Sequence, residues 1–254
     1  MDLRRFKMSL VIAIKDKNRI VLGADKQTSI GNNKDHLATK IWEVSDLPGA
    51  LMGSVGSVRV SQILQYSELI DKNSLGEMPT FEFIVRSLVP IIRATLEGNG
   101  VRCSFPESED AVSVMMPNSL LFAYKDRAWM IWHDFSVSEI YDYLAIGSGS
   151  DIAKGVLFAT TEKNPFERIV TAIDAAAENT VYVDDGIDLL VTEEKSTDFK
   201  QFSKALGVEI QKLEVQEGNL QEKESELEEK KEPEKKDSAK KSKKTTKKKE
   251  EKES

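Results

Sequence analysis

Cysteine is almost absent from this 254-residue chain, which contains Cys103 and no other. One thiol cannot form a disulfide within the chain, so a disulfide-stapled scaffold is excluded and a reducing, cytoplasmic location is expected. Long apolar runs are missing too. No stretch reaches the roughly 18 residues that a membrane helix needs, so we expect no membrane association.

Histidine is equally scarce. His36 and His133 are far apart and in no ligand spacing, which gives no reason to expect a histidine metal site. The first eight residues, MDLRRFKM, are basic, but the apolar stretch at 10–14 that follows is too short for a signal peptide.

The C-terminal part of the chain lacks apolar residues. Residues 214–254 hold 13 Lys against 13 Asp or Glu, with almost nothing apolar after Leu227. Such a segment cannot offset its ordering entropy by burial, so we expect a disordered tail. Its last 20 residues include 10 Lys, a pattern also seen in nucleic-acid binding, but the interleaved acids favour a solvated tail without a nucleic-acid partner.

Apolar runs and turns fill the rest. Ser9–Ile14 and Ile20–Ala24 flank a polar turn and predict a hairpin. The other predicted strands are Lys40–Val44, Ala50–Gly53, Ala111–Met116, Leu120–Tyr124, Ala128–Trp132, Tyr143–Ile146 and Ile187–Thr192.

Helical spacing of apolar residues predicts four helices, over residues 60–70, 81–92 (with a kink at Pro90), 152–160 and from 165 onward. Asn164, Pro165 and Glu167 form a helix-start signal for the last one. The order of elements indicates an α+β fold with two antiparallel sheets between helix layers. We expect one domain at 9–196, an extension or propeptide at 1–8, and a linker or short helix at 197–213.

Five segments, taken in register, resemble the proteasome β-subunit family and most of all its HslV branch. They are Gly23-Ala24-Asp25 with the loop at 26–32, the strand-entry Lys40, the glycine pair in Gly53-Ser54-Val55-Gly56, Ala145–Ser150 with its G-S-G step, and Ala172–Tyr182. The resemblance implies a four-layer αββα Ntn-hydrolase sandwich and an N-terminal-nucleophile endopeptidase.

Ser9 falls at the family's nucleophile position, where the usual residue is Thr. In such enzymes the nucleophile's own free α-amine is the base, so Ser9 has to become N-terminal. Two routes are open: cleavage of a propeptide between Met8 and Ser9, or translation from Met8 followed by Met removal. The alternative is that Ser9 is an ordinary residue at a strand start.

The resemblance implies roles for other residues. Lys40 would lower the pKa of the α-amine and stabilise developing negative charge, and Asp25 would orient Lys40. Gly53 would donate its N–H to the oxyanion. The two remaining site residues are Ser148, near the α-amine, and Glu178, at a helix end. Without the resemblance, Lys40 is a strand lysine, Asp25 a turn carboxylate, Gly53 a turn glycine and Glu178 a surface acid.

The backbone carbonyls of Ala177, Thr180 and Val183 fall where HslV-type subunits can hold a structural monovalent or divalent cation; no cofactor is required. The resemblance also implies a homo-oligomeric ring or double ring, an ATP-dependent unfoldase as a partner, and unfolded polypeptide as substrate. Two alternatives remain, a catalytically inactive subunit of the same fold and an Ntn amidase acting on small amides.

Overall fold

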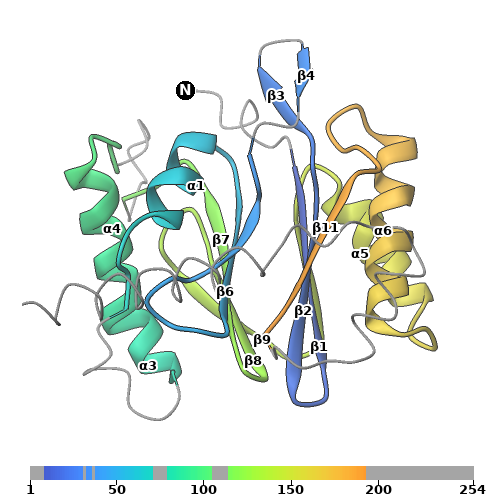
Figure 1. The fold of residues 1–254 in the computed structure, drawn as a ribbon, viewed down its shortest axis with the longest axis horizontal. Coiled ribbons are helices and arrows are strands. Elements are labelled where there is room, and N and C mark those ends of the chain that lie inside the picture. The colour runs from blue at the N-terminus through green and yellow to red at the C-terminus, as the bar shows by residue number, and fades with distance from the viewer. Residues whose placement is uncertain (1–8, 31–32, 36–37, 71–78, 105–113, 193–254) are drawn as a thin grey trace, which may run out of the picture. The chain divides into compact units, whose positions relative to one another are not determined.

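Two antiparallel sheets lie face to face in the computed structural model, and helices cover the outer side of each (Figure 1). The structure describes residues 9–30, 33–35, 38–70, 79–104 and 114–192. This arrangement confirms the expected α+β class and its four-layer αββα order. The predicted extension at 1–8, linker at 197–213 and tail at 214–254 lie outside the described residues.

The first sheet has the N-terminal hairpin at its centre. Its strand order is β10-β1-β2-β11, with β1 at Leu10–Asp16, β2 at Arg19–Asp25, β10 at Tyr143–Gly147 and β11 at Ile187–Val191. All of β2 and the first five residues of β1 are buried. Burial on both faces explains why these strands are continuous apolar runs and not alternating patterns.

The second sheet has the order β5-β6-β7-β8-β9. Its strands are Ile41–Glu43, Ala50–Val55, Ser119–Tyr124, Arg127–Ile131 and Val137–Ile140. A separate two-stranded ribbon, β3 at Thr28–Ile30 with β4 at Asn33–Asp35, projects beyond the sheets (Figure 1).

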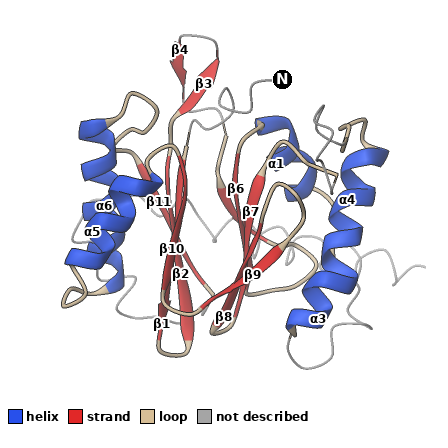
Figure 2. Cartoon of the chain, turned by 180° about the vertical axis from the view of Figure 1, so that it is seen from behind, coloured by secondary structure: helices blue, strands red, loops and turns tan. Residues whose placement is uncertain are grey.

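Helices form the two outer layers, and Figure 2 shows them on opposite sides of the paired sheets. Outside the second sheet lie α1 (Val58–Gln65), α3 (Phe81–Phe83) and α4 (Val89–Gly98). Outside the first sheet lie α5 (Ser150–Ala159) and α6 (Pro165–Asn179).

Two local sequence signals explain how the helices begin and bend. The Asn164 side chain accepts a hydrogen bond from the Glu167 N–H at 2.9 Å, and Pro165 takes the first position of α6. The irregularity expected at Pro90 lies one turn earlier, as a π-helical turn, η2, at Ile84–Leu88. Proline has no N–H to give to the preceding turn, and a widened turn accommodates the missing bond.

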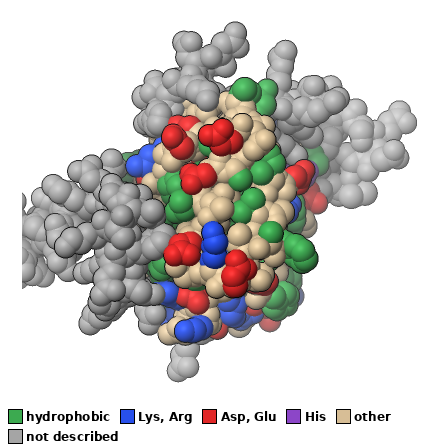
Figure 3. All heavy atoms as spheres, turned by 90° about the vertical axis from the view of Figure 1, so that its right-hand side faces the viewer, with side chains coloured by type: hydrophobic (Ala, Val, Ile, Leu, Met, Phe, Trp, Pro, Cys, Tyr) green, Lys and Arg blue, Asp and Glu red, His purple; other side chains and the backbone are tan. Residues whose placement is uncertain are grey.

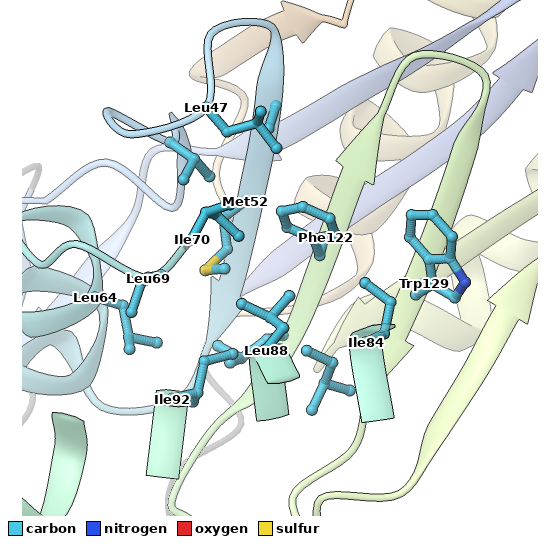
Figure 4. Close-up of a cluster of buried hydrophobic side chains, with 14 of the residues drawn as sticks. Leu47, Met52, Leu64, Leu69, Ile70, Ile84, Leu88, Ile92, Phe122 and Trp129 are labelled. Carbon is cyan, nitrogen blue, oxygen red and sulfur yellow. The ribbon is translucent and has the colours of Figure 1, made fainter. Parts of the chain in front are cut away.

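Three apolar clusters hold the layers together. Along β1, Leu10 and Ile12 face α5 and α6, whereas Val11 and Ala13 face the second sheet. This alternation is the period of a strand buried on both faces. The third cluster joins the second sheet to its helices, and Figure 4 shows Met52, Phe122 and Trp129 against leucines and isoleucines of the helix layer. Each fully buried side chain of this size contributes roughly 1.5–3 kcal/mol.

The strand prediction for Ala111–Met116 was wrong in its described part. Residues 111–113 lie outside the described residues, and Met115 makes only an isolated bridge with Ser104. Strand β9 was not predicted, because VSEI is short and only partly apolar. It forms a strand by pairing with β8. Among the described helices, none is long and apolar enough to span a membrane.

Candidate active site

A buried ion pair lies where the N-terminal hairpin ends. Asp25 is the last residue of β2, and Lys40 stands one residue before β5. The Lys40 Nζ lies 2.6 Å from Asp25 Oδ1, and the two residues are 7% and 0% exposed. The fold thus brings together two of the residues singled out in the sequence.

The Asp25 carboxylate connects this pair to the start of β1. Its Oδ1 also accepts the Leu10 N–H at 2.7 Å, and its Oδ2 accepts the Gln27 N–H at 3.2 Å. Because one oxygen accepts from both Lys40 and Leu10, the ammonium lies beside the Ser9–Leu10 peptide. A cation is therefore held next to the residue in the nucleophile position.

Burial acts against both charges of the pair. It raises the pKa of Asp25 above its usual value, although Lys40 and the Leu10 N–H act in the opposite direction. It lowers the pKa of Lys40, while Asp25, Asp184 and Asp188 oppose that shift. Shifts of this kind, with a specific partner, are common at reactive sites.

Ser9 itself is 5% exposed and is fixed by β10. Its carbonyl accepts the Ser148 N–H at 2.8 Å. Gly147 has φ +108°, and a Cβ there would lie 2.0 Å from the Ser9 oxygen, so only glycine permits this approach. Ser148 thus contacts Ser9 through its backbone N–H and carries a buried hydroxyl without a partner among the described residues.

The position of Gly53 is fixed by its neighbours in the second sheet. Ser54 N–H donates to the Lys40 carbonyl at 2.8 Å, and Gly53 is paired with Ile41 on one side and Leu121 on the other. Hydrogen bonds alternate along an antiparallel strand, so the Gly53 N–H points to Leu121 in β7. The oxyanion role expected for Gly53 stays a prediction. Its lack of a side chain serves packing, since a Cβ would lie 2.9 Å from Val11.

Gly56 follows the last residue of β6, precedes α1 and has φ +129°. A Cβ at Gly56 would lie 2.5 Å from the Pro117 carbonyl oxygen, so the turn requires glycine.

The remaining predicted residues lie at the end of α6. Glu178 is exposed. Burial raises the pKa of the nearby Asp174, and Asp185 and Glu178 add to that shift. Figure 3 views the side of the molecule on which α5 and α6 lie, where acidic and apolar side chains share the surface. No contact joins Glu178 to Asp25 or Lys40 among the described residues.

The carbonyls proposed as cation ligands belong to residues that follow one another around this helix end. Ala177 lies in the last turn of α6, Thr180 is its C-cap and Val183 is buried beyond it. Among the described residues, no group of three or more His, Cys, Asp or Glu side chains could hold a metal ion. A cation here would depend on backbone oxygens alone.

Three residues near the site were not predicted. Gln27 donates through its side chain to the Val181 carbonyl at 3.1 Å, Asp184 accepts the Lys26 N–H at 3.2 Å, and Asn118 contacts the Gly56 turn. The glycine pair pointed to the segment containing Gly56, but no sequence spacing connects Asn118 to it.

Comparison with known proteins identifies the fold. No protein-family model and no curated protein matches the sequence. BPH of Thiobacillus denitrificans in complex with epoxomicin matches with a TM-score of 0.55 and 22% identity, covering 73% of this chain and 99% of that one. Eukaryotic HslV of Trypanosoma brucei matches with a TM-score of 0.51 and 20% identity, covering 72% of this chain and 98% of that one. Anbu, an ancestral beta-subunit, of Yersinia bercovieri matches with a TM-score of 0.54 and 14% identity, covering 78% of this chain and 93% of that one.

The chain therefore has the proteasome β- or HslV-type Ntn-hydrolase fold. Identities of 14–22% establish the shared fold, and the activity has to be argued from the residues of the site.

Proposed function

We propose that this chain hydrolyses peptide bonds of unfolded polypeptides, with Ser9 as an N-terminal nucleophile. The observation that carries the proposal is the buried Asp25 oxygen that accepts from both the Lys40 ammonium and the Leu10 N–H. A buried ion pair weakens a fold as often as it stabilises it. Because the ion pair lies against the Ser9–Leu10 peptide, we assign it a catalytic role.

The reaction begins when the free α-amine of Ser9 takes the proton of its own Oγ. The oxygen bonds to the scissile carbonyl carbon, the C–N bond breaks, and the departing amine takes that proton. Water then attacks the Ser9 ester, gives one proton to the α-amine and releases the acid product, and the α-amine returns the proton to Oγ. Lys40 favours the neutral amine and the developing negative charge.

A backbone N–H of the segment Gly53–Gly56 is proposed as the oxyanion donor, since a side chain there would crowd an approaching carbonyl. Ser148 is the candidate partner of the α-amine, because its backbone N–H bonds to Ser9 and its buried hydroxyl has no partner among the described residues.

The remaining roles follow from the resemblance to the HslV branch. We propose a homo-oligomeric ring or double ring in the cytoplasm, supplied with unfolded chains by an ATP-dependent unfoldase. A structural cation on the carbonyls of Ala177, Thr180 and Val183 belongs to the same proposal. Glu178 is exposed and is better explained as a surface acid.

A second candidate function is that of an inactive subunit with the same fold. One observation favours it: Ser9 follows eight residues in the sequence, and an amide nitrogen inside a chain cannot act as the base. Serine in place of the family's threonine is compatible with either function.

The test uses chains whose translation begins at Met8, so that removal of Met8 leaves Ser9 as the N-terminal residue. It compares the unsubstituted chain with variants at Ser9. Intact mass verifies the N-terminus, and cleavage of a fluorogenic peptide and of an unfolded protein reports activity. Ser9→Ala should abolish turnover, by at least about 10³-fold, because nucleophile removal leaves only binding and oxyanion stabilisation. Ser9→Thr should retain turnover, since it keeps the hydroxyl.

The matched control is Ser136→Ala, which removes an exposed hydroxyl in the turn after β8 and should leave turnover unchanged. Epoxomicin, bound in the BPH structure, serves as a second probe whose binding should require Ser9. A verified Ser9 N-terminus without any turnover, or equal activity in Ser9→Ala, would refute the peptidase and leave the inactive subunit.

A further inference from the structure

The connection between α6 and β11, residues 180–186, lies against two parts of the candidate site. Val183 is 1% exposed, and a Cβ added at Gly149 would lie 3.1 Å from the Val183 side chain. Two residues earlier in the connection, the Val181 carbonyl accepts a hydrogen bond from the Gln27 side chain at 3.1 Å. The connection therefore touches the G-S-G step as well as the segment that follows β2.

Gln27 is a buried polar residue that is bonded in two directions. It lies two residues beyond the end of β2 and is 2% exposed. Its backbone N–H donates to Asp25 Oδ2 at 3.2 Å, and its Nε2 donates to the Val181 carbonyl, 154 residues away in the sequence. The position of the N–H that meets Asp25 is thus tied to the connection after α6.

The two oxygens of the Asp25 carboxylate have different partners. Oδ1 accepts from the Lys40 ammonium at 2.6 Å and from the Leu10 N–H at 2.7 Å, whereas Oδ2 accepts from the Gln27 N–H. Rotation of the carboxyl group would break the bonds of both oxygens. The Gln27 N–H therefore selects the orientation in which a single oxygen meets both Lys40 and Leu10.

Lys26 holds the same connection in a different way. Its N–H donates to the Gly186 carbonyl at 3.0 Å and to Asp184 Oδ1 at 3.2 Å, next to the pairing of Asp25 with Ile187. These contacts continue the β2–β11 pairing and keep the two backbones side by side. The bond from Gln27, in contrast, acts on the catalytic carboxylate itself.

We infer that Gln27 is a positioning residue that orients the Asp25 carboxylate toward Lys40, with the Val181 carbonyl as its anchor. The inference rests on the proposed peptidase function and deepens it, because Gln27 acts through Asp25 and Lys40. A misplaced ammonium stabilises the developing negative charge less well. Since this charge is present mainly in the transition state, loss of the anchor should lower kcat more than it changes KM.

The experiment uses the full chain with translation begun at Met8 and two substitutions. Gln27→Met keeps the length of the side chain but has no N–H to give to Val181. Gln27→Ala removes the side chain and is the second variant if the first one fails to fold. Both should lower kcat by about 3- to 10-fold with KM within about twofold, the range expected for the loss of one neutral hydrogen bond.

The pH profile of kcat/KM separates positioning from general damage. Burial lowers the pKa of Lys40, and three carboxylates act against that shift, those of Asp25, Asp184 and Asp188. The Lys26 ammonium lies 3.3 Å from Asp188. When Asp25 is no longer held, Lys40 loses part of its stabilisation as a cation. The alkaline fall in Gln27→Met should therefore lie at lower pH than in the unsubstituted chain, by about 0.5–1 unit, which corresponds to the same 3- to 10-fold factor.

Thr192→Val is the matched control. Thr192 directly follows β11 and is also buried, and it joins the other end of β2 to its surroundings. It accepts the Ile20 N–H at 3.0 Å and donates to the Lys125 carbonyl. Its loss should lower the unfolding temperature without changing kcat or the alkaline limb.

Three results would overturn the inference. They are a folded Gln27 variant with unchanged kcat, a loss of kcat with the alkaline limb in its original place, and the same changes in Thr192→Val. If the unsubstituted chain with a verified Ser9 N-terminus cleaves no peptide, the proposed function falls and the inference with it. Turnover that both Gln27 variants leave intact removes only the role of Gln27.

Discussion

Asp25 and Lys40 illustrate at the scale of single residues how function can work against stability. The raised pKa of Asp25 means that this carboxyl favours folding below its unfolded-state value of about 3.8 and loses that contribution as pH rises. The lowered pKa of Lys40 means that its contribution is present above 10.5 and is lost as pH falls. Between these limits both charges oppose folding, and the short contact between them offsets part of that cost.

The same pair predicts the pH dependence of turnover. The α-amine of Ser9 must be neutral, and a nearby ammonium lowers its pKa below the ~7.7–8.0 of a free amino group, so kcat/KM should rise with pH at values below that range. Lys40 must be charged, and because burial lowers its pKa, kcat/KM should fall again below pH 10.5. A pH profile of kcat/KM measures both limbs.

Lys40→Arg tests the assignment of the second limb. Guanidinium stays ionised throughout, so the alkaline fall should vanish while the acid limb remains, at a lower overall rate because the larger group alters the contact with Asp25. An alkaline limb that persists unchanged in Lys40→Arg would assign it to another group.

The end of β10 determines, at the scale of elements, where the first strand begins. Gly147 pairs with Leu10, and the next residue, Ser148, holds the Ser9 carbonyl. Local sequence predicts the strand, but the position of Ser9 depends on a glycine more than 130 residues later. The approach of these two backbones is what gives the hydroxyl of Ser9 a fixed place.

Gly147→Ala should therefore damage both stability and activity. A residue with φ +108° and a Cβ 2.0 Å from a carbonyl oxygen requires β1 to move away from β10. We expect a loss of more than about 2 kcal/mol in the free energy of unfolding and loss of turnover. Urea unfolding and peptide cleavage measure the two effects.

Gly155→Ala is the matched control, because nothing lies within 4 Å of a Cβ at that exposed position in α5. It should leave turnover unchanged and stabilise the protein by about 0.5–1 kcal/mol through helix propensity. A tolerated Gly147→Ala would show that β10 does not fix the first strand.

Several large apolar side chains are exposed on the described part of the molecule. Tyr66, Tyr141 and Phe158 are 83%, 79% and 75% exposed, on or beside α1, β9 and α5 respectively. Single exposed aromatics are common, but they are also the residues most enriched at protein interfaces. A ring would cover some of them.

We accordingly predict that the natively purified protein has a mass of several subunits. Native mass spectrometry at low micromolar concentration should give one closed oligomer of a fixed number of chains, since repeated heterologous contacts close into rings. Tyr66→Lys, Tyr141→Lys and Phe158→Lys, made singly, should shift the mass toward the monomer for those side chains that lie in a contact. A monomer at all concentrations would contradict the ring.

Short segments of the chain specify the layers of this protein. The apolar runs of β1 and β2, the helical stripes and the start signal at Asn164 act through local geometry and burial, so their pattern is written in short segments of the chain. Ser9, Asp25, Lys40 and Ser148 could be singled out because a resemblance linked those segments.

Contacts between residues that are distant in the sequence depend on the tertiary structure. Strand register in the second sheet pairs Gly53 with Ile41 and Leu121 and leaves Gly56 in a turn, although both glycines fit the same motif. Asn118 had no signal in the sequence, because its three hydrogen bonds span 61 and 64 residues. Contacts between distant segments depend on strand register and packing, which no local pattern of residues specifies.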